Sequence, residues 1–164
     1  MFSLVRDFGF QILAVSSVAF VSLVSGRSEI LSLDYLPPAH AAQVDDLMPG
    51  ARVIDGGIRF LEIEAGEGPS ICEGDKVEAI YTGKLLDGTV FNRKAGQFHT
   101  YRFEVGADPR EVIMGWELSL PLMQKGGRYS IAIPSQFAYR EKGRSGQVPP
   151  FSTVIFEIEI LNVE

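Results

Sequence analysis

The chain has few of the side chains that reactive chemistry requires, beginning with cysteine: Cys72 stands alone among 164 residues. A single cysteine excludes a disulfide within the chain and a metal site built from several thiolates. A nucleophilic cysteine needs a partner base, and no pattern ties His99, the one histidine after residue 41, to Cys72. We therefore expect an inert thiol, no metal and no cofactor.

Clustered basic residues are also missing. Lysine and arginine number 15 against 21 aspartate and glutamate residues, which gives a net charge of −6. Phosphate contacts need grouped lysine and arginine side chains, so this balance argues against a nucleic-acid partner. The sequence contains no Ser/His/Asp set and no glycine-rich phosphate loop. Hydrophobic residues make up 46% and charged residues 22%, which is typical of a globular domain.

The first 41 residues differ in composition from the rest. Residues 8–26 contain no charged side chain, and an arginine stands near each end. This length just spans a bilayer and also resembles the apolar core of a signal sequence. Ala39-His40-Ala41 fits the small-x-small pattern of signal peptidase sites, which predicts cleavage after Ala41. We interpret residues 1–41 as a targeting segment.

This interpretation predicts export across a membrane, and the destination that we favour is the thylakoid lumen of a chloroplast. The long gap between the apolar stretch and the cleavage site suits a multi-part targeting sequence. The secretory pathway, the periplasm and an uncleaved membrane anchor remain open alternatives. Any membrane contact would then be confined to the N-terminal segment.

After a polar lead-in over residues 42–56, the sequence is typical of short strands. Apolar and polar residues alternate with the period of two that marks a half-buried strand. Asp87-Gly88 lies between two such runs and predicts a tight hairpin turn, because glycine readily adopts a positive φ. The clearest alternating segments are residues 57–66, 75–83, 99–106, 127–134 and 153–162.

One segment departs from this period. Between Val112 and Leu122 the apolar residues recur at helical spacing. Pro121 and the pair Gly126-Gly127 predict the end of this helix, because proline lacks the N–H group and glycine tolerates the left-handed region. We predict an α+β domain over residues 57–164, in which a twisted antiparallel sheet carries one short helix across its concave face.

Four stretches of this domain now match a known family in order and spacing. The chain resembles the FK506-binding type of peptidyl-prolyl isomerase, the immunophilins, over residues 57–164. The resemblance implies a half-open antiparallel sheet wrapped around one short α-helix. The matching stretches are "YTGKLLDGTVFN", "VIMGWELSLPLMQKGGR", "IPSQFAY" and "VPPFSTVIFEIEIL".

The resemblance also implies an aromatic pocket between helix and sheet. From the pattern alone, Trp116 is either ordinary core or a pocket floor; the family match favours the floor, on which a proline ring rests. The family's donors to substrate carbonyls correspond to the Ile113 N–H and the Tyr139 hydroxyl, and Asn92 is the third candidate catalytic residue. The implied substrate-binding residues are Tyr81, Phe91, Tyr101, Val112, Ile113, Trp116, Tyr139 and Phe156.

The chain departs from the family pattern at the pocket rim. Asn92 stands where the family has an aspartate, and the usual arginine partner of that aspartate is replaced near Gln97. The loop over residues 140–147, "REKGRSGQ", is more basic than is usual, and we interpret it as a solvated flap rather than an anion site. Tyr101 replaces a phenylalanine and adds a hydroxyl group.

The resemblance predicts a peptidyl-prolyl cis-trans isomerase that assists protein folding without a cofactor. The alternative is a catalytically weak chaperone or assembly factor that uses the same groove, because Asn92 removes a charged pair. The implied partners are proline-containing protein clients and macrolide ligands of the FK506 type.

Overall fold

The computed structural model describes residues 35–96 and 99–164 of the chain. The apolar stretch 8–26 and Gln97, the expected neighbour of Asn92, therefore lie outside the described residues. Within the described part, no helix is both long enough and apolar enough to cross a membrane.

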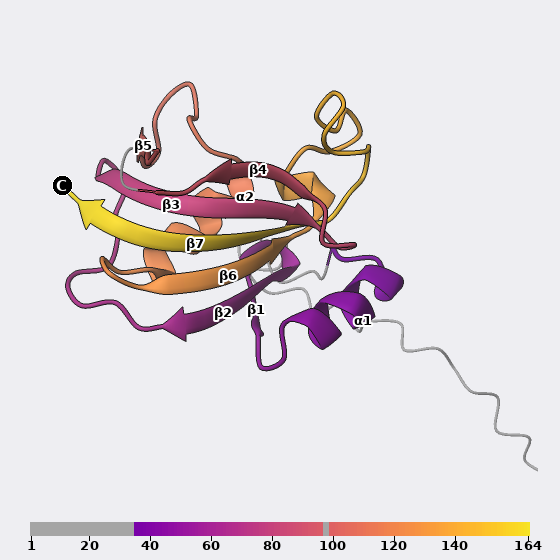
Figure 1. Ribbon diagram of the computed structural model, residues 1–164. Coiled ribbons are helices and arrows are strands. Elements are labelled where there is room, and N and C mark those ends of the chain that lie inside the picture. Colours follow the sequence, from indigo (N-terminus) through magenta and orange to yellow (C-terminus); the bar gives the residue numbers. More distant parts are fainter. Residues whose placement is uncertain (1–34, 97–98) are drawn as a thin grey trace, which may run out of the picture.

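The seven strands of the described residues form one antiparallel sheet (Figure 1). Their order along the sheet is β1-β2-β6-β7-β3-β4, and β5 pairs with β3 outside this path. Each of the five segments predicted from alternation forms a strand, with its bounds shifted by at most two residues. The strands are β1 (Arg52–Ile54), β2 (Ile58–Glu64), β3 (Lys76–Leu85), β4 (Val90–Lys94), β5 (Tyr101–Glu104), β6 (Arg128–Ile133) and β7 (Val154–Val163).

A hairpin turn joins β3 to β4 at the predicted Asp87-Gly88 pair. Gly88 has a φ of 86°, and the Asp87 carboxylate accepts a hydrogen bond from the Thr89 N–H at 2.9 Å. The turn returns β4 along β3, so that Gly83 pairs with Asn92 in the ladder. This pairing places the Asn92 side chain beside the inner face of the sheet.

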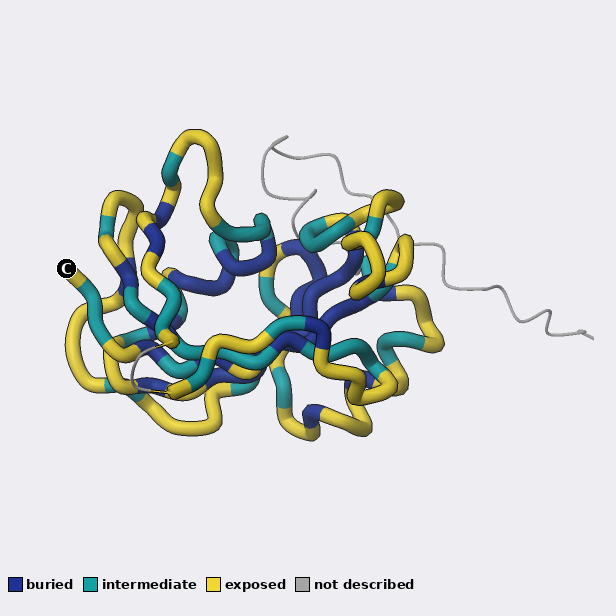
Figure 2. Tube along the Cα trace, turned by 45° about the horizontal axis from the view of Figure 1, so that its top comes forward, coloured by how far each residue is buried: buried dark blue, intermediate teal, exposed yellow. Residues whose placement is uncertain are grey.

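The predicted helix is α2 (Met114–Ser119), which the 3₁₀ turn η2 (Leu120–Leu122) continues. Gly115 allows the helix to lie close to β6, because a Cβ atom there would collide with the Ile133 side chain. Trp116 and Leu120 enter the main core. Figure 2 shows buried stretches both in the middle of the sheet and in the segment that crosses it. The predicted α+β architecture is confirmed.

A second helix, α1 (Pro38–Leu47), was not predicted. Val44 and Met48 are buried against Ala132 of β6 and Ile155 of β7, whose chain neighbours face the main core. Because side chains alternate along a strand, α1 must cover the opposite face of the sheet from α2. The lead-in expected over residues 42–56 is therefore structured: it contains most of α1, then β1 and the 3₁₀ turn η1 (Asp55–Gly57).

Candidate active site

A cavity of about 470 Å³ lies between α2 and the inner face of the sheet. Its inner end is buried and aromatic, and its mouth carries three exposed charged residues, Lys94, Glu111 and Arg144. Of the residues proposed from the sequence, all but Phe91 line this cavity. Those that line it are Tyr81, Asn92, Tyr101, Val112, Ile113, Trp116, Tyr139 and Phe156.

Trp116 is both a core residue and part of the cavity wall. Its side chain is 3% exposed, yet it lines the inner end of the cavity. The ring edges of Tyr81, Phe156 and Phe103 meet it, with centroids at 5.2, 5.4 and 5.7 Å. Its Nε1 has no hydrogen-bond partner among the described residues, so ring packing alone holds the indole in place.

Tyr81 of β3 and Asn92 of β4 meet on one side of the cavity. Both side chains line the cavity and come from neighbouring strands of the sheet. Burial is the main effect on Tyr81 and raises the pKa of its hydroxyl, while the Asn92 amide acts weakly in the opposite direction. The hydroxyl is therefore neutral, and Asn92 adds no charge beside it.

Tyr139 follows the 3₁₀ turn η3 (Ser135–Phe137) and faces the cavity from the other side. Burial raises the pKa of its hydroxyl above the ordinary value. The nearby Arg144 guanidinium, whose charge favours the ionised form, acts against this rise. Because burial is the larger effect, the hydroxyl keeps its proton and can donate it into the cavity.

Tyr101 fixes the loop that precedes α2. Its hydroxyl donates a 2.7 Å hydrogen bond to the backbone carbonyl of Glu111, two residues before Ile113. Ile113 is the N-cap of α2, and its N–H has no acceptor among the described residues. The first N–H groups of a helix lack partners within the helix, so this donor is available to a carbonyl in the cavity.

Phe91 lies behind the cavity wall. It is 7% exposed, and its ring packs edge-on against Tyr139 at 5.8 Å and Phe156 at 5.6 Å. Gly83 of β3 makes room for these rings, because a Cβ atom there would come within 2.8 Å of both Phe91 and Phe156. Phe91 thus supports two residues that line the cavity.

A comparison with known protein families identifies the family of the region that contains this cavity. The family model described as FKBP-type peptidyl-prolyl cis-trans isomerase matches residues 68–161, which include the whole cavity. The chain belongs to this family.

Two FKBP-type proteins illustrate the degree of sequence identity and the length of chain that it covers. The FKBP-type 22 kDa peptidyl-prolyl cis-trans isomerase of Escherichia coli is 39% identical over 114 residues, which are 70% of this chain and 53% of that protein. FK506-binding protein 1 of Saccharomyces cerevisiae is 32% identical over 114 residues, 69% of this chain and 98% of that protein. The chain thus spans about half the length of the first relative and nearly all of the second.

The fold has solved counterparts. The crystal structure of a peptidyl-prolyl cis-trans isomerase from Pseudomonas syringae superposes with a TM-score of 0.66 at 30% sequence identity. The superposition covers 77% of this chain and 91% of that one. This FKBP-type chain therefore shares more than the local motifs with its relatives.

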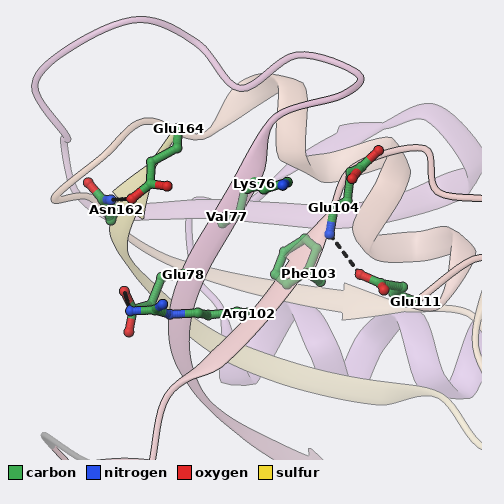
Figure 3. A pocket seen from close by; sticks show the side chains of 9 residues that line it. All are labelled: Lys76, Val77, Glu78, Arg102, Phe103, Glu104, Glu111, Asn162 and Glu164. Atoms are coloured by element: carbon green, nitrogen blue, oxygen red, sulfur yellow. Dashed lines mark hydrogen bonds and ion pairs between the residues drawn. The ribbon is translucent and has the colours of Figure 1, made fainter.

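A second cavity, of about 270 Å³, contrasts with the aromatic one (Figure 3). It lies over β3, β5 and the end of β7, and charged side chains line it. The Glu78 carboxylate accepts hydrogen bonds from Thr100 at 2.7 Å and from Arg102 at 3.0 Å, which lower its pKa. The Glu78–Arg102 pair is therefore already satisfied, and the aromatic cavity remains the candidate functional site of this FKBP-type domain.

Three residues of the aromatic cavity were missed from the sequence: Lys94, Glu111 and Arg144. For Lys94 a signal existed, because it stands two residues after Asn92 and shares its side of the strand. Arg144 lies in the loop that we interpreted as a solvated flap. Only the folded chain brings it to Tyr139.

Proposed function

We propose that the protein is a peptidyl-prolyl cis-trans isomerase, which accelerates rotation about the bond before proline in other proteins. The observation that carries this proposal is the aromatic cavity itself. A proline ring would pack on the buried indole of Trp116, between the rings of Tyr81 and Phe156. Carbonyl groups on either side of the ring would meet the Tyr139 hydroxyl and the Ile113 N–H.

The reaction requires no covalent step by the protein. Twisting the amide breaks its resonance at a cost of about 20 kcal/mol, and no bond between heavy atoms forms or breaks. The planar amide separates more charge than the twisted one, so transfer from water to an aromatic cavity disfavours the planar ground state. Hydrogen bonds that fit only the twisted carbonyl stabilise the transition state selectively.

Each candidate residue has a defined role in this mechanism. Tyr139 donates its proton to the twisted carbonyl, beside the Arg144 guanidinium. The Ile113 N–H fixes a second carbonyl. Asn92 lines the cavity next to Tyr81 and acts as a positioning residue in our proposal.

The test is isomerisation of short peptides with a Leu-Pro or Ala-Pro bond, measured by NMR exchange with the purified full chain. We expect clear acceleration, and a loss of at least about tenfold for Trp116→Leu, because the ring surface under the proline is removed. Leu47→Ala, at an exposed position of α1, is the matched control and should retain the parent rate. A folded parent without acceleration would contradict the proposal.

The alternative of a catalytically weak binding module predicts a different result. Such a protein would bind a proline peptide or FK506 without accelerating exchange. We propose that macrolides of the FK506 type compete with peptides for the same cavity, since both would use the aromatic floor. Inhibition of the exchange reaction by FK506 tests this directly.

We also propose that the protein is exported, with cleavage after Ala41 and the thylakoid lumen as the favoured destination. The support is the uncharged stretch 8–26 followed by the small-x-small motif, as set out above. Mass spectrometry of the N-terminus recovered from the native organism tests the cleavage, and fractionation tests the compartment. A mature N-terminus at Met1 would contradict it.

A further inference from the structure

The mouth of the aromatic cavity carries two cationic side chains in a chain that is acidic overall. Lys94 and Arg144 line the cavity, whereas the net charge of the whole chain is −6. Neither cation was expected there. Because both cations line the cavity and have no acidic partner in the described part of the chain, they bear on the charge of the substrate that the cavity would attract.

The fold fixes both cations at the cavity. On β4 the side chains alternate, so Asn92 and Lys94 line the aromatic cavity, while Arg93 lies with Thr82 at a separate hollow of the sheet. Arg144 is held by two backbone hydrogen bonds with Val148, at 2.8 and 2.9 Å, and its guanidinium lines the cavity with Tyr139. Its loop is therefore more defined than a solvated flap.

No carboxylate neutralises these two cations among the described residues. Several other lysine and arginine side chains form ion pairs, such as Lys84 with Glu157 at 2.7 Å and Arg128 with Glu64 at 2.9 Å. No ion pair of Lys94 or Arg144 is found in residues 35–96 and 99–164.

The two nearby positions that could supply a negative charge do not neutralise the cations. Asn92 is a neutral amide where the family has an aspartate. The Glu111 carboxylate accepts a 2.7 Å hydrogen bond from the Glu104 N–H on the side of the second cavity (Figure 3). The charged residues that line the aromatic cavity are therefore two cations and one carboxylate, and that carboxylate is engaged by the Glu104 N–H.

We propose that the cavity selects prolyl peptides with an acidic side chain next to the proline, whose carboxylate binds between Lys94 and Arg144. This proposal rests on the proposed isomerase function and names its substrate class. The guanidinium of Arg144 has five N–H donors in a planar group, a geometry that suits a carboxylate. The apolar walls strengthen the attraction relative to open water, while the acidic remainder of the surface repels such peptides elsewhere.

The experiment compares peptides that differ in one side chain: Glu-Pro, Gln-Pro and Leu-Pro, and the same residues placed directly after proline. Glutamate and glutamine have the same shape, so the ratio of their kcat/KM values isolates the charge. We expect a preference for glutamate of about threefold to fivefold in at least one position, the size expected for exposed ion pairs. The preference should fall as salt is raised.

Variants then assign the preference to the two cations. Lys94→Gln and Arg144→Gln should each reduce the Glu/Gln ratio, and the double variant should bring it to one. Lys142→Gln is the matched control, because Lys142 is exposed in the same loop and does not line the cavity. It should leave the ratio unchanged.

The outcomes separate this proposal from the isomerase function. If Leu-Pro is isomerised while the Glu/Gln ratio equals one in both positions, the proposed selectivity is wrong and the isomerase proposal stands. If no peptide is isomerised, the isomerase function itself fails, and the selectivity fails with it. A preference that persists in the double variant would also overturn the assignment to Lys94 and Arg144.

Discussion

The hydroxyl of Tyr139 carries the most specific residue-scale prediction. Tyr139→Phe keeps the ring against Phe91 but removes the proton that we assign to the twisted carbonyl. We expect kcat/KM to fall by about tenfold, the value of one hydrogen bond made in the transition state. Peptide exchange measured by NMR gives this ratio.

The control for Tyr139→Phe is another tyrosine outside the cavity. The Tyr129 hydroxyl accepts a 2.9 Å hydrogen bond from the Gln124 N–H, and the side chain is fully buried in the core. Tyr129→Phe should lower the free energy of unfolding and leave kcat/KM unchanged. Equal activity losses in both variants would show that Tyr139 acts through stability and would contradict its assigned role.

The three tyrosines of the cavity predict a pH dependence. Burial raises the pKa of Tyr81, Tyr101 and Tyr139 above the ordinary value of 10.0. Above pH 10 the folded protein therefore binds more protons than the unfolded chain, so the free energy of unfolding falls as pH rises further. Below pH 10 these groups contribute no pH dependence.

Two measurements check this behaviour. NMR of protein labelled at the tyrosine ring carbons should show the three hydroxyls ionising later than free tyrosine. Urea unfolding at a series of pH values should show stability declining only on the alkaline side. Ionisation of the folded tyrosines at or below pH 10 would contradict the burial argument.

At the scale of elements, α1 is expected to behave as part of the folded domain. Val44 is fully buried against Met48, Ala132 and Ile155, so Val44→Ala should lower the free energy of unfolding by about 2 kcal/mol. Leu47→Ala, in the same helix but 52% exposed, should change it by less than about 0.5 kcal/mol. Chemical denaturation of both variants decides whether α1 is docked in solution.

Helix α1 was not predicted because few of its residues are buried. The strands could be predicted because their solvent-facing side chains are polar. In β7, for example, Phe156 and Ile158 are buried and Glu157 between them is exposed. In α1 only Val44 is buried within the helix, which leaves no helical repeat of apolar residues. A helix held by one or two side chains is set by tertiary contact rather than by its own pattern.

The residues of the cavity could also be predicted only in part. Asn92, Trp116 and Tyr139 were found because the family resemblance assigned each position. Arg144 has no such assignment, although it follows Tyr139 closely in the chain. Its place at the cavity depends on the conformation of the loop, which local sequence does not specify.

At the scale of the whole molecule, the proposed targeting segment and the folded domain overlap. The proposed cleavage after Ala41 lies inside α1 and would remove the first four residues of that helix. It would also remove the hydrogen bond between His40 and Thr153 at 3.0 Å, and the contact of the Tyr35 ring with Phe137. Cleavage should therefore be easiest before the domain folds.

This overlap predicts a measurable difference between two shortened forms. A form that begins at Tyr35 keeps these contacts, and one that begins at Ala42 loses them together with the buried Leu36. We expect the Ala42 form to fold with a free energy of unfolding lower by about 1–2 kcal/mol, the combined value of one hydrogen bond and one apolar side chain partly lost. Urea denaturation of the two forms measures this. If they are equally stable, residues 35–41 add nothing to the domain; if the Ala42 form does not fold, cleavage after Ala41 is incompatible with a functional product.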